Sequence, residues 1–402
     1  MSSDLHRPVT DLPKMLADLE ELVLCESFSA DLDAVARSAD VVAAQGARLL
    51  GARPDRIVID GVTHLRWTFG TPRVLLLGHH DTVWPVGTLA RHPWSVLDGV
   101  ARGPGVFDMK AGLVQLFHAL AALPSLDGVS VLVTGDEEVG SVTSRALIEE
   151  SARGCAAVFV PEPSAGGALK TARKGISLYE VVLHGRAAHA GLEPERGINA
   201  TVEAAHQILA IASLAALADT DTDTDTDTAP AAGEGSGKGT GEGSGKGDGG
   251  AGGTTVTPTV VAAGTTGNTV PATARISVDA RVATMAAQAR VDELMRGLSP
   301  RLPGARVEVL GGPNRPPLEE AASRELFALA QKIAAELGMA PLRGVAVGGG
   351  SDGNFTAGAG YPTLDGLGAV GGGAHADDEH VVVADMPSRA TLLAGLVATV
   401  TR

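Results

Sequence analysis

The sequence predicts an α/β protein: a main domain on a mainly parallel, twisted sheet, with a smaller α+β domain of ferredoxin-like order inserted into it. Three observations support this fold class. Short apolar runs alternate with segments of helical period, polar residues follow several apolar runs directly, and the middle of the chain changes to a β-α-β-β-α-β order. Uninterrupted apolar strands between helices are typical of a parallel sheet that is covered on both faces.

The first part of the chain alternates helix and strand. Helical periodicity predicts the helices, and short apolar runs predict the strands. The expected helices are 11–24, 31–50, 110–123 and 141–151, and the expected strands are 56–60, 64–69, 74–77, 129–134 and 156–160. Several of these strands lead straight into polar residues. Because ligands of open α/β sheets bind beyond the carboxyl ends of the strands, we expect a functional site at this edge.

The middle of the chain predicts a separate small domain. Its expected strands are 176–183, 255–263, 274–282 and 306–310, and its expected helices are 199–217 and 284–298. This β-α-β-β-α-β order is typical of a small α+β sandwich. From residue 318 the chain returns to helix, glycine-rich turn, strand and terminal helix. We therefore predict a main domain of residues 1–174 and 314–402, interrupted by a domain of residues 175–313.

One segment, residues 219–253, has a composition of its own. It is an Asp-Thr repeat followed by a glycine-rich tract in which the unit G-E-G-S-G-K-G occurs twice. Such a sequence buries too little apolar area to offset chain entropy, so we expect a disordered insert. A calcium loop is a weaker interpretation, since the alternating aspartates lack a shaping turn and a bidentate glutamate.

Composition and charge exclude several classes of protein. The chain has 402 residues, 44% of them hydrophobic, so it can bury a core. Its formal charge of -15 would repel a phosphate backbone, which argues against a nucleic-acid partner. Two cysteines, Cys25 and Cys155, make neither a disulfide framework nor a thiolate zinc site. With no signal-like or membrane-length apolar run, we expect a cytoplasmic protein without a membrane partner.

Histidine and carboxylate residues gather after the predicted strands and turns. The set comprises His79, Asp108, Glu137, Glu138, Glu162 and His375. Each of these contexts alone is modest evidence, because a capping aspartate or a satisfied histidine explains it equally well. Together they form an imidazole and oxygen set that suits zinc, manganese or cobalt. Adjacent glutamates at a strand end also indicate a compensating cation, and one of the two would remain as a base.

The motifs resemble those of the dinuclear zinc peptidase family that contains glutamate carboxypeptidase, aminoacylase and succinyl-diaminopimelate desuccinylase. The resemblance covers nearly the whole chain apart from residues 219–253. The segment N-R-P-P-L-E (314–319) is similar to the glutamate carboxypeptidase branch in particular. The motifs in family order are G-H-H-D-T-V (78–83), G-P-G-V-F-D-M-K-A-G (103–112), G-D-E-E-V-G-S (135–141), P-E-P-S (161–164), H-A-G-x-x-P-E-x-G-x-N-A (189–200) and G-G-G-A-H-A-D-D-E-H-V (371–381).

The resemblance implies a role for each of these residues. His79 and Glu162 would bind one divalent metal ion, Glu138 and His375 would bind a second, and Asp108 would bridge both. Zinc is the expected metal, with cobalt and manganese as alternatives.

The family also implies catalytic roles. Glu137 would be the general base and acid, and Asp81 would orient His79, since a carboxylate partner fixes the ring tautomer. The peptide bond after Asp108 is expected to be cis, as in relatives, and His80 is interpreted as structural.

The resemblance further implies a homodimer formed through the inserted lid domain. His189 would reach in from the partner subunit and stabilise the tetrahedral oxyanion. Asn268 and Arg281 would hold a substrate carboxylate, for which an arginine fork is well suited. Arg315 would assist them, although an exposed loop arginine is an equally good interpretation.

These residues predict a metal-dependent amidohydrolase. It would release a C-terminal amino acid, with glutamate as one candidate, from an N-acyl or short peptidyl substrate that has a free carboxylate. Metal-bound hydroxide would attack the amide carbonyl while Glu137 moves the proton. The alternatives are an N-acyl-amino-acid deacylase, a biosynthetic deprotecting hydrolase, a secreted peptidase, and a catalytically silent metal-binding module.

Overall fold

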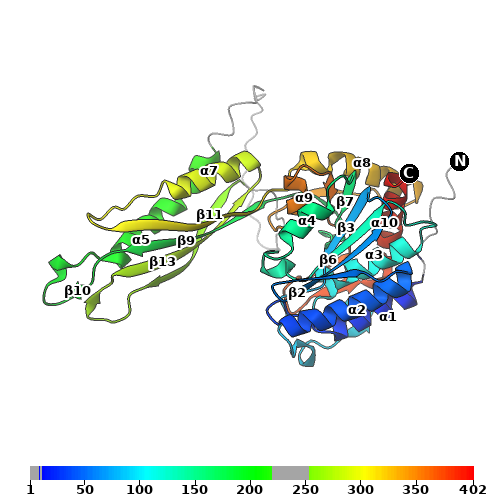
Figure 1. Cartoon of the computed structure of the whole chain (residues 1–402), viewed down its shortest axis with the longest axis horizontal. Helices are drawn as coiled ribbons and strands as arrows, with labels where there is room; N and C mark the ends of the chain where they lie inside the picture. The colour runs from blue at the N-terminus through cyan, green and yellow to red at the C-terminus, as the bar shows by residue number, and fades with distance from the viewer. Residues whose placement is uncertain (1–8, 10, 220–252) are drawn as a thin grey trace, which may run out of the picture. The chain divides into compact units, whose positions relative to one another are not determined.

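The computed structural model describes residues 9, 11–219 and 253–402, and these form two compact units (Figure 1). Unit 1 comprises Met1–Arg173 and Pro317–Arg402, and unit 2 comprises Lys174–Pro316. Unit 2 is thus inserted into unit 1 in the sequence, with boundaries close to those that the change of pattern indicates. Apart from its two end residues, the expected disordered insert 219–253 lies outside the described residues.

A six-stranded, mainly parallel sheet forms the centre of unit 1. The strand order is β1-β2-β6-β3-β7-β16. Strands β6, β3, β7 and β16 run parallel, whereas β2 and β1 form an antiparallel edge. Their bounds are β1 (Asp55–Ile59), β2 (Val62–Phe69), β3 (Val74–His79), β6 (Val129–Thr134), β7 (Ala157–Phe159) and β16 (Thr363–Leu364).

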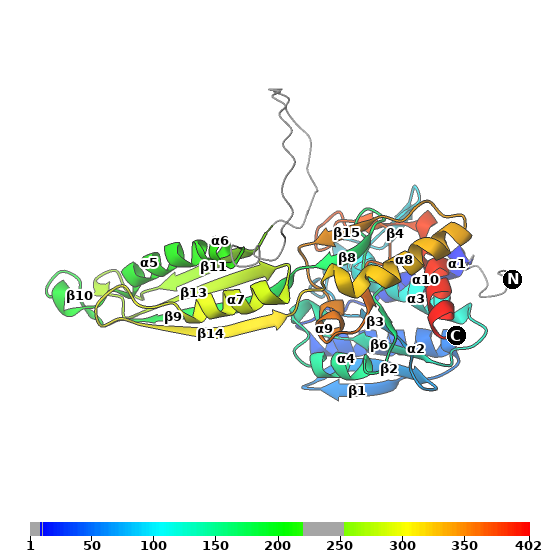
Figure 2. The same ribbon diagram turned by 90° about the horizontal axis from the view of Figure 1, so that it is seen from above.

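Helices cover both faces of this sheet, as Figures 1 and 2 show. Alternate residues of β3 enter different cores: Val74 and Leu76 pack into the larger core, and Leu75 and Leu77 into the smaller one. The larger core is formed with α1 (Leu12–Leu24), α2 (Leu32–Leu50), α3 (Ala111–Ala121), α8 (Glu320–Glu336) and α10 (Met386–Val400), and the smaller one with α4 (Arg145–Ser151) and α9 (Gly353–Gly358). This two-sided burial explains why the parallel strands read as continuous apolar runs.

Capping residues explain where the helices begin. Asp31 caps α2 by accepting a hydrogen bond from the backbone N–H of Ala34 at 2.9 Å. The helix expected over 141–151 instead begins at Arg145. The buried carboxylate of Asp136 accepts hydrogen bonds from Thr143 and Ser144, which holds the preceding residues in a turn. A local polar network therefore overrides helical periodicity there.

Short strands place two loops of unit 1 that carry candidate site residues. A small sheet has the order β17-β18-β5-β4. Within it, β18 pairs antiparallel with β5, with His380 opposite Arg102. This pairing brings the loop before His380 beside the turn that follows Arg102. The bounds are β4 (Ser95–Leu97), β5 (Val100–Arg102), β17 (Gly371–Gly372) and β18 (His380–Val382), and a separate parallel pair joins β8 (Leu169–Arg173) to β15 (Gly344–Val347).

Unit 2 has the β-α-β-β-α-β order that its sequence indicates. Its four long strands are antiparallel in the order β11-β13-β9-β14, and three helices share one core with the sheet. The helix expected over 199–217 is divided after residue 212, and the strand expected over 306–310 continues to Arg315. The bounds are β9 (Gly175–His184), α5 (Ala200–Ala212), α6 (Leu214–Asp219), β11 (Thr255–Ala263), β13 (Thr273–Val282), α7 (Met285–Arg296) and β14 (Arg306–Arg315).

One stretch of the described chain, Ala200–Asp219, is long and apolar enough to cross a membrane by length and composition alone, with a mean hydropathy of 1.4. The expectation that the chain contains no such stretch was therefore too strict. In unit 2 this stretch has a packed face with buried polar groups. The buried carboxylate of Glu203 accepts backbone hydrogen bonds from Arg301 and Leu302, and Gln207 donates to Ser299. These contacts favour a helix that packs on its own sheet.

Candidate metal centre

The carboxyl ends of three neighbouring strands carry most of the candidate ligands. His79 is the last residue of β3, and Glu138 lies in the short turn η3 (Glu137–Val139) that follows β6. Glu162 comes shortly after β7. Since β6, β3 and β7 are adjacent and parallel, these residues meet at one edge of the sheet. Asp108 reaches the same edge from η2 (Val106–Lys110), the turn that leads into α3.

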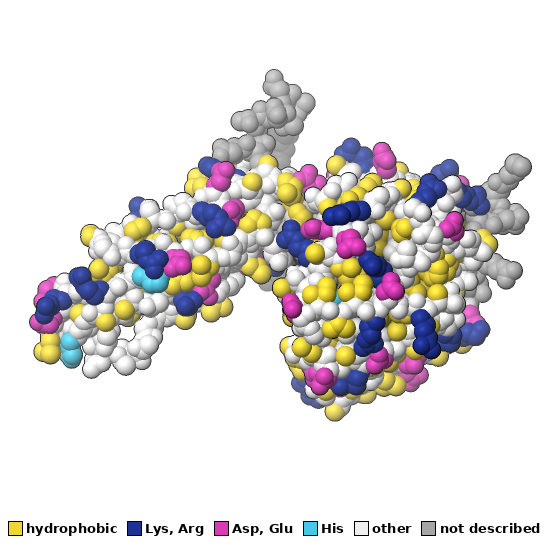
Figure 3. Space-filling view, viewed as in Figure 1, with side chains coloured by type: hydrophobic (Ala, Val, Ile, Leu, Met, Phe, Trp, Pro, Cys, Tyr) yellow, Lys and Arg dark blue, Asp and Glu magenta, His cyan; other side chains and the backbone are white. Residues whose placement is uncertain are grey.

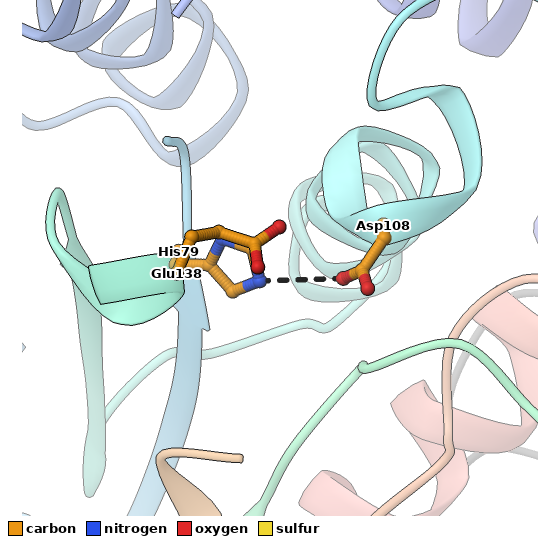
Figure 4. A group of neighbouring side chains, drawn as sticks. All are labelled: His79, Asp108 and Glu138. Carbon is orange, nitrogen blue, oxygen red and sulfur yellow. Dashed lines mark ion pairs between the residues drawn. The ribbon is translucent and has the colours of Figure 1, made fainter. Parts of the chain in front are cut away.

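Asp108 lies between the two candidate histidine ligands. Its Oδ1 atom is 3.4 Å from Nε2 of His79, and its Oδ2 atom is 3.5 Å from Nε2 of His375. A further carboxylate approaches each histidine. Glu162 Oε1 is 3.3 Å from Nε2 of His79, and Glu138 Oε2 is 3.1 Å from Nε2 of His375. Figure 4 shows the His79 ring and the Asp108 carboxylate facing each other, with Glu138 beside the ring.

The donor set fits divalent metal ions. Nε2 of His79 and Oδ1 of Asp108 are buried and have no hydrogen-bond partner among the described residues. Such orphaned atoms are expected where an ion completes a site. Nitrogen and oxygen ligands lie about 2.0–2.2 Å from zinc, so two ligands of one ion are roughly 3–3.5 Å apart. The separations around Asp108 fall in this range on both of its sides.

The geometry therefore defines two half-sites that share Asp108. One potential ligand atom from each of His79, Asp108 and Glu138 lies within 4.8 Å of the other two. The individual distances resolve this group further, since Glu162 faces His79 and Glu138 faces His375. The half-site of His79 is buried. His375 lies on a loop with its side chain 48% exposed, so the second half-site is open to solvent.

Charges at the centre are strongly coupled. Burial lowers the pKa of His79, but the carboxylates of Asp108, Asp81 and Glu162 outweigh it and hold this pKa well above its usual range. The carboxylates of Asp108 and Glu138 raise the pKa of His375 to about 10. Without a metal ion, protons therefore occupy the positions that a cation would take, and metal binding must release them.

Asp81 links both glutamates to His79. Its fully buried carboxylate accepts hydrogen bonds from the backbone N–H groups of Glu137 and Glu138, both at 3.2 Å, and from the Ser29 hydroxyl at 2.7 Å. Nδ1 of His79 lies 3.0 Å from the backbone oxygen of Asp81 and 3.4 Å from its carboxylate. Once the ring loses its second proton, a proton on Nδ1 would leave the Nε2 lone pair free to bind a cation between Asp108 and Glu162. The buried Glu137 is thereby held beside the centre.

Three further polar residues belong to this centre and were not singled out from the sequence. Arg173 donates to Glu162 and binds Asp365 through two hydrogen bonds of 2.8 Å. Glu379 accepts a hydrogen bond from the backbone N–H of Asp108. Arg173 and Asp365 lie in no recognisable motif. The signal for Glu379 was its position four residues after His375 in the last family motif.

The predicted residues of unit 2 fall at opposite ends of its sheet. Arg281 and Arg315 both pair with Ile176, so they flank the first part of β9. His189 and Asn268 lie beyond the other end. His189 ends the short strand β10 (Ala188–His189), Asn268 precedes its partner strand β12 (Thr269–Val270), and the backbone N–H of Ala190 donates to the backbone oxygen of Asn268 at 2.9 Å. Asn268 is therefore placed with His189 rather than with Arg281. The sequence-based grouping of Asn268 with Arg281 is not found within one unit.

The side chains of these unit 2 residues also differ in their hydrogen-bond partners and in their burial. Both guanidinium contacts of Arg281 go to Asp279, at 2.7 and 2.8 Å, so its fork is already paired. Arg315 ends β14 and is buried, which excludes the exposed-loop interpretation. Nδ1 of the exposed His189 accepts backbone hydrogen bonds from Gly191 and Leu192. This arrangement leaves the ring proton on Nε2, where it is available to a ligand.

Two histidines, three carboxylates and a neighbouring spare glutamate at the edge of a parallel sheet define the centre of a metal-dependent hydrolase. The chain belongs to peptidase family M20/M25/M40, whose sequence profile matches residues 75–399. This match confirms the resemblance that the motifs indicate.

Individual relatives agree with this assignment over nearly the whole chain. Carboxypeptidase G2 of Pseudomonas sp. (strain RS-16) is 28% identical over 412 residues, covering 98% of this chain and 91% of that protein. The M20 family metallo-carboxypeptidase Sso-CP2 of Sulfolobus solfataricus shares the fold, with a TM-score of 0.66, 16% identity, and coverage of 96% of this chain and 99% of that one. A dinuclear metal binding M20 peptidase of Bacillus subtilis gives a TM-score of 0.58 and 13% identity, covering 97% and 98%.

Proposed function

We propose that this protein is a metal-dependent amidohydrolase that releases a C-terminal amino acid, glutamate being the first candidate, from an N-acyl or peptidyl group. The observation that carries the proposal is the position of Asp108, whose two carboxylate oxygens face His79 and His375 separately. Family membership and the similarity to carboxypeptidase G2 support the same reaction class.

Two divalent ions would be held by two sets of side chains. His79, Asp108 and Glu162 would hold one ion, and Asp108, Glu138 and His375 would hold the other. Zinc is the proposed metal, with cobalt and manganese as alternatives, because imidazole with carboxylate suits all three. When bound, such ions polarise an amide carbonyl and lower the pKa of water.

Glu137 is the proposed proton carrier. It is held beside the centre by the hydrogen bond from its backbone N–H to Asp81. Glu138 would bind a metal ion together with His375, so it is not available as a base. Glu137 would then accept a proton from water and deliver it to the leaving nitrogen. Arg173 places a buried positive charge near the same group.

We also propose that the protein acts as a homodimer through unit 2. Within one unit, His189 and Asn268 lie beyond one end of the ten-residue strand β9, and Arg281 and Arg315 lie at the other. At about 3.3 Å per residue, the two groups are on the order of 30 Å apart. One small substrate cannot contact both groups of the same copy, so its binding by both His189 and Arg281 would require a second copy.

Mixing two inactive variants tests this dimer. In Glu137→Gln the His189 side chain is intact, and in His189→Ala the glutamate is intact. If His189 acts across the dimer, each mixed dimer contains one complete centre, so random reassembly should restore about a quarter of wild-type activity. Activity that stays at the level of the separate variants, with dimers shown by sedimentation, would contradict the shared site.

Amino-acid release by the purified protein tests the proposed reaction. The substrates would be N-acyl amino acids and dipeptides that differ in the C-terminal residue, assayed with chelator and with added zinc, cobalt or manganese. Chelator-sensitive release of one amino acid from several acyl groups is the expected result. Selection for the acyl group instead would identify an N-acyl-amino-acid deacylase or a biosynthetic deprotecting hydrolase, and no release despite bound metal would favour a silent binding module.

The cellular setting is proposed to be the cytoplasm, without a nucleic-acid or membrane partner. Cys25 and Cys155 carry free thiols, which suits a reducing compartment. On the face shown in Figure 3, basic side chains are interspersed with acidic ones rather than gathered into a stripe, unlike the basic surface of a nucleic-acid binder. Cell fractionation would test the location.

A further inference from the structure

Glu379 holds the turn that carries Asp108. Its Oε1 atom accepts hydrogen bonds from the backbone N–H groups of Phe107 at 2.9 Å and Asp108 at 3.0 Å. Its Oε2 atom accepts from the backbone N–H of Gly105 at 2.9 Å and from the indole N–H of Trp84 at 2.7 Å. Four donors thus converge on one buried carboxylate from a distant part of the chain.

The same residue belongs to the loop that carries His375. Glu379 follows His375 by four residues, and it directly precedes His380, which pairs with Arg102 at the start of the turn toward Asp108. The β18–β5 pairing brings these two segments together, and the Glu379 carboxylate links them directly at the turn of Asp108. Each segment supplies a candidate ligand to the solvent-exposed half-site. The half-site of His79 does not depend on this link in the same way, since His79 ends a buried strand.

Only a carboxylate meets the requirements of this position. The side chain is 4% exposed, and a buried charge is costly unless it is hydrogen-bonded. Here both oxygens receive N–H donors, and hydrogen bonds to a charged acceptor are about twice as strong as neutral ones. A glutamine would have to point its own NH2 group at one pair of these donors, so it would lose bonds at either Trp84 and Gly105 or Phe107 and Asp108.

We infer that Glu379 is a positioning residue that sets the distance between Asp108 and His375, and so controls metal binding at the exposed half-site. The inference rests on the proposed two-metal centre. Loss of the clamp should weaken the ion held by His375, Glu138 and Asp108 much more than the ion held by His79, Glu162 and Asp108. Supporting groups of metal ligands typically change metal affinity by roughly 10- to 100-fold.

The test compares Glu379→Gln with Asp377→Asn. Both variants remove one negative charge from the same loop, but Asp377 is exposed and contacts His92 rather than the Asp108 turn. Metal content after dialysis in limiting zinc, and titration of the metal-free proteins with cobalt followed by visible absorption, give the two affinities. The expected result is two ions in wild type and Asp377→Asn, and a second ion bound at least about tenfold more weakly in Glu379→Gln.

Two further variants separate positioning from folding. Glu379→Asp should recover part of the second-ion affinity, since it keeps the charge but shortens the reach. Trp84→Phe removes one donor to Oε2 and should weaken the second ion by a smaller factor, which tests the clamp even if Glu379→Gln does not fold. The inference would be overturned if Trp84→Phe and a folded Glu379→Gln bound the second ion as tightly as wild type does. A wild-type protein that binds fewer than two ions would instead overturn the proposed two-metal centre.

Discussion

Arg173 donates a hydrogen bond from Nη2 to Oε2 of Glu162 across 3.1 Å, while the other oxygen of Glu162 faces His79 at 3.3 Å. The same guanidinium binds the fully buried Asp365 through Nε and Nη2 and donates to the carbonyls of Gly349 and Gly350. Arg173 therefore orients a candidate ligand and balances two buried carboxylates. Its neighbours in turn hold its pKa above the usual range, against the effect of burial.

Arg173→Met should destabilise unit 1 by about 3–5 kcal/mol, because it removes the cation that pairs with the buried Asp365 and donates to Glu162. Urea unfolding in the presence of a chelator excludes any contribution of bound metal. All three tryptophans, Trp67, Trp84 and Trp94, lie in unit 1, so their fluorescence reports on this unit.

The control for Arg173 is Arg66→Met. Arg66 pairs with the exposed Glu150 at 3.5 Å, and a surface pair of this kind contributes less than about 1 kcal/mol. If both variants lost a similar amount of unfolding free energy, the buried network of Arg173 would contribute no more to stability than the surface pair of Arg66.

Glu137→Gln should abolish turnover and leave metal content unchanged. Removing a general base lowers the rate by roughly 10²- to 10⁴-fold, whereas the proposed metal ligands stay intact. The adjacent Glu138→Gln is the matched control, since it changes the neighbouring side chain that faces His375. It should lose metal as well as activity. If Glu137→Gln lost metal and Glu138→Gln kept it, the two roles would have to be exchanged.

The strand-end motifs predicted the centre because sheet topology converts sequence into proximity. His79, Glu138 and Glu162 each follow a parallel strand, and adjacent parallel strands end at the same edge. Their positions could therefore be anticipated from local patterns alone. Apolar runs also indicated strand limits: β6 and β11 have the bounds that the sequence predicts, and the other expected strands differ at one or both ends.

The supporting network could not be predicted in this way. Asp365 satisfies Arg173 across 192 residues, and Glu379 satisfies Asp108 across 271. Asp365 carries no local signature of its contact, and the position of Glu379 in the last family motif does not reveal its partner, because a buried carboxylate and a solvated one look the same in sequence. Within one unit, Asn268 precedes β13 and Arg281 lies at the end of that strand, so the length of β13 separates them.

The stability of the metal-free protein should fall as the pH drops from about 6.5 to about 4, and His80 should cause part of this loss. Burial lowers the pKa of His80 to about 4. Its Nε2 lies 3.0 Å from the carbonyl of Thr63, whereas Nδ1 is buried without a hydrogen-bond partner among the described residues. The folded state therefore keeps the ring neutral. Its contribution is fully present above the ordinary pKa of 6.5, declines below it, and is lost below about 4.

The difference between wild type and His80→Gln isolates this contribution. The variant keeps a donor for Thr63 but does not titrate. The span between a pKa of 6.5 and one of about 4 corresponds to about 3 kcal/mol. Urea titrations at several pH values, followed by tryptophan fluorescence, should show wild type losing about this much more than the variant. Parallel curves for the two proteins would mean that His80 does not titrate in this range.

Gly112→Ala should weaken both unit 1 and its metal centre. A Cβ atom at this position in α3 would lie 2.0 Å from the backbone oxygen of Pro161, the residue before Glu162. The absence of a side chain thus lets the end of β7 approach the helix that follows Asp108. In an open helix position alanine is favoured over glycine by about 1 kcal/mol. A lower free energy of unfolding for Gly112→Ala would therefore be the opposite of what helix propensity predicts. Overpacking typically costs about 1–3 kcal/mol.

The matched control is Gly348→Ala, where a Cβ would meet nothing within 4 Å. Urea unfolding and zinc affinity should both fall for Gly112→Ala and stay near wild type for Gly348→Ala. A Gly112→Ala protein of unchanged stability would show that β7 and α3 can separate without cost, and the close approach would then not be what holds Glu162 near Asp108.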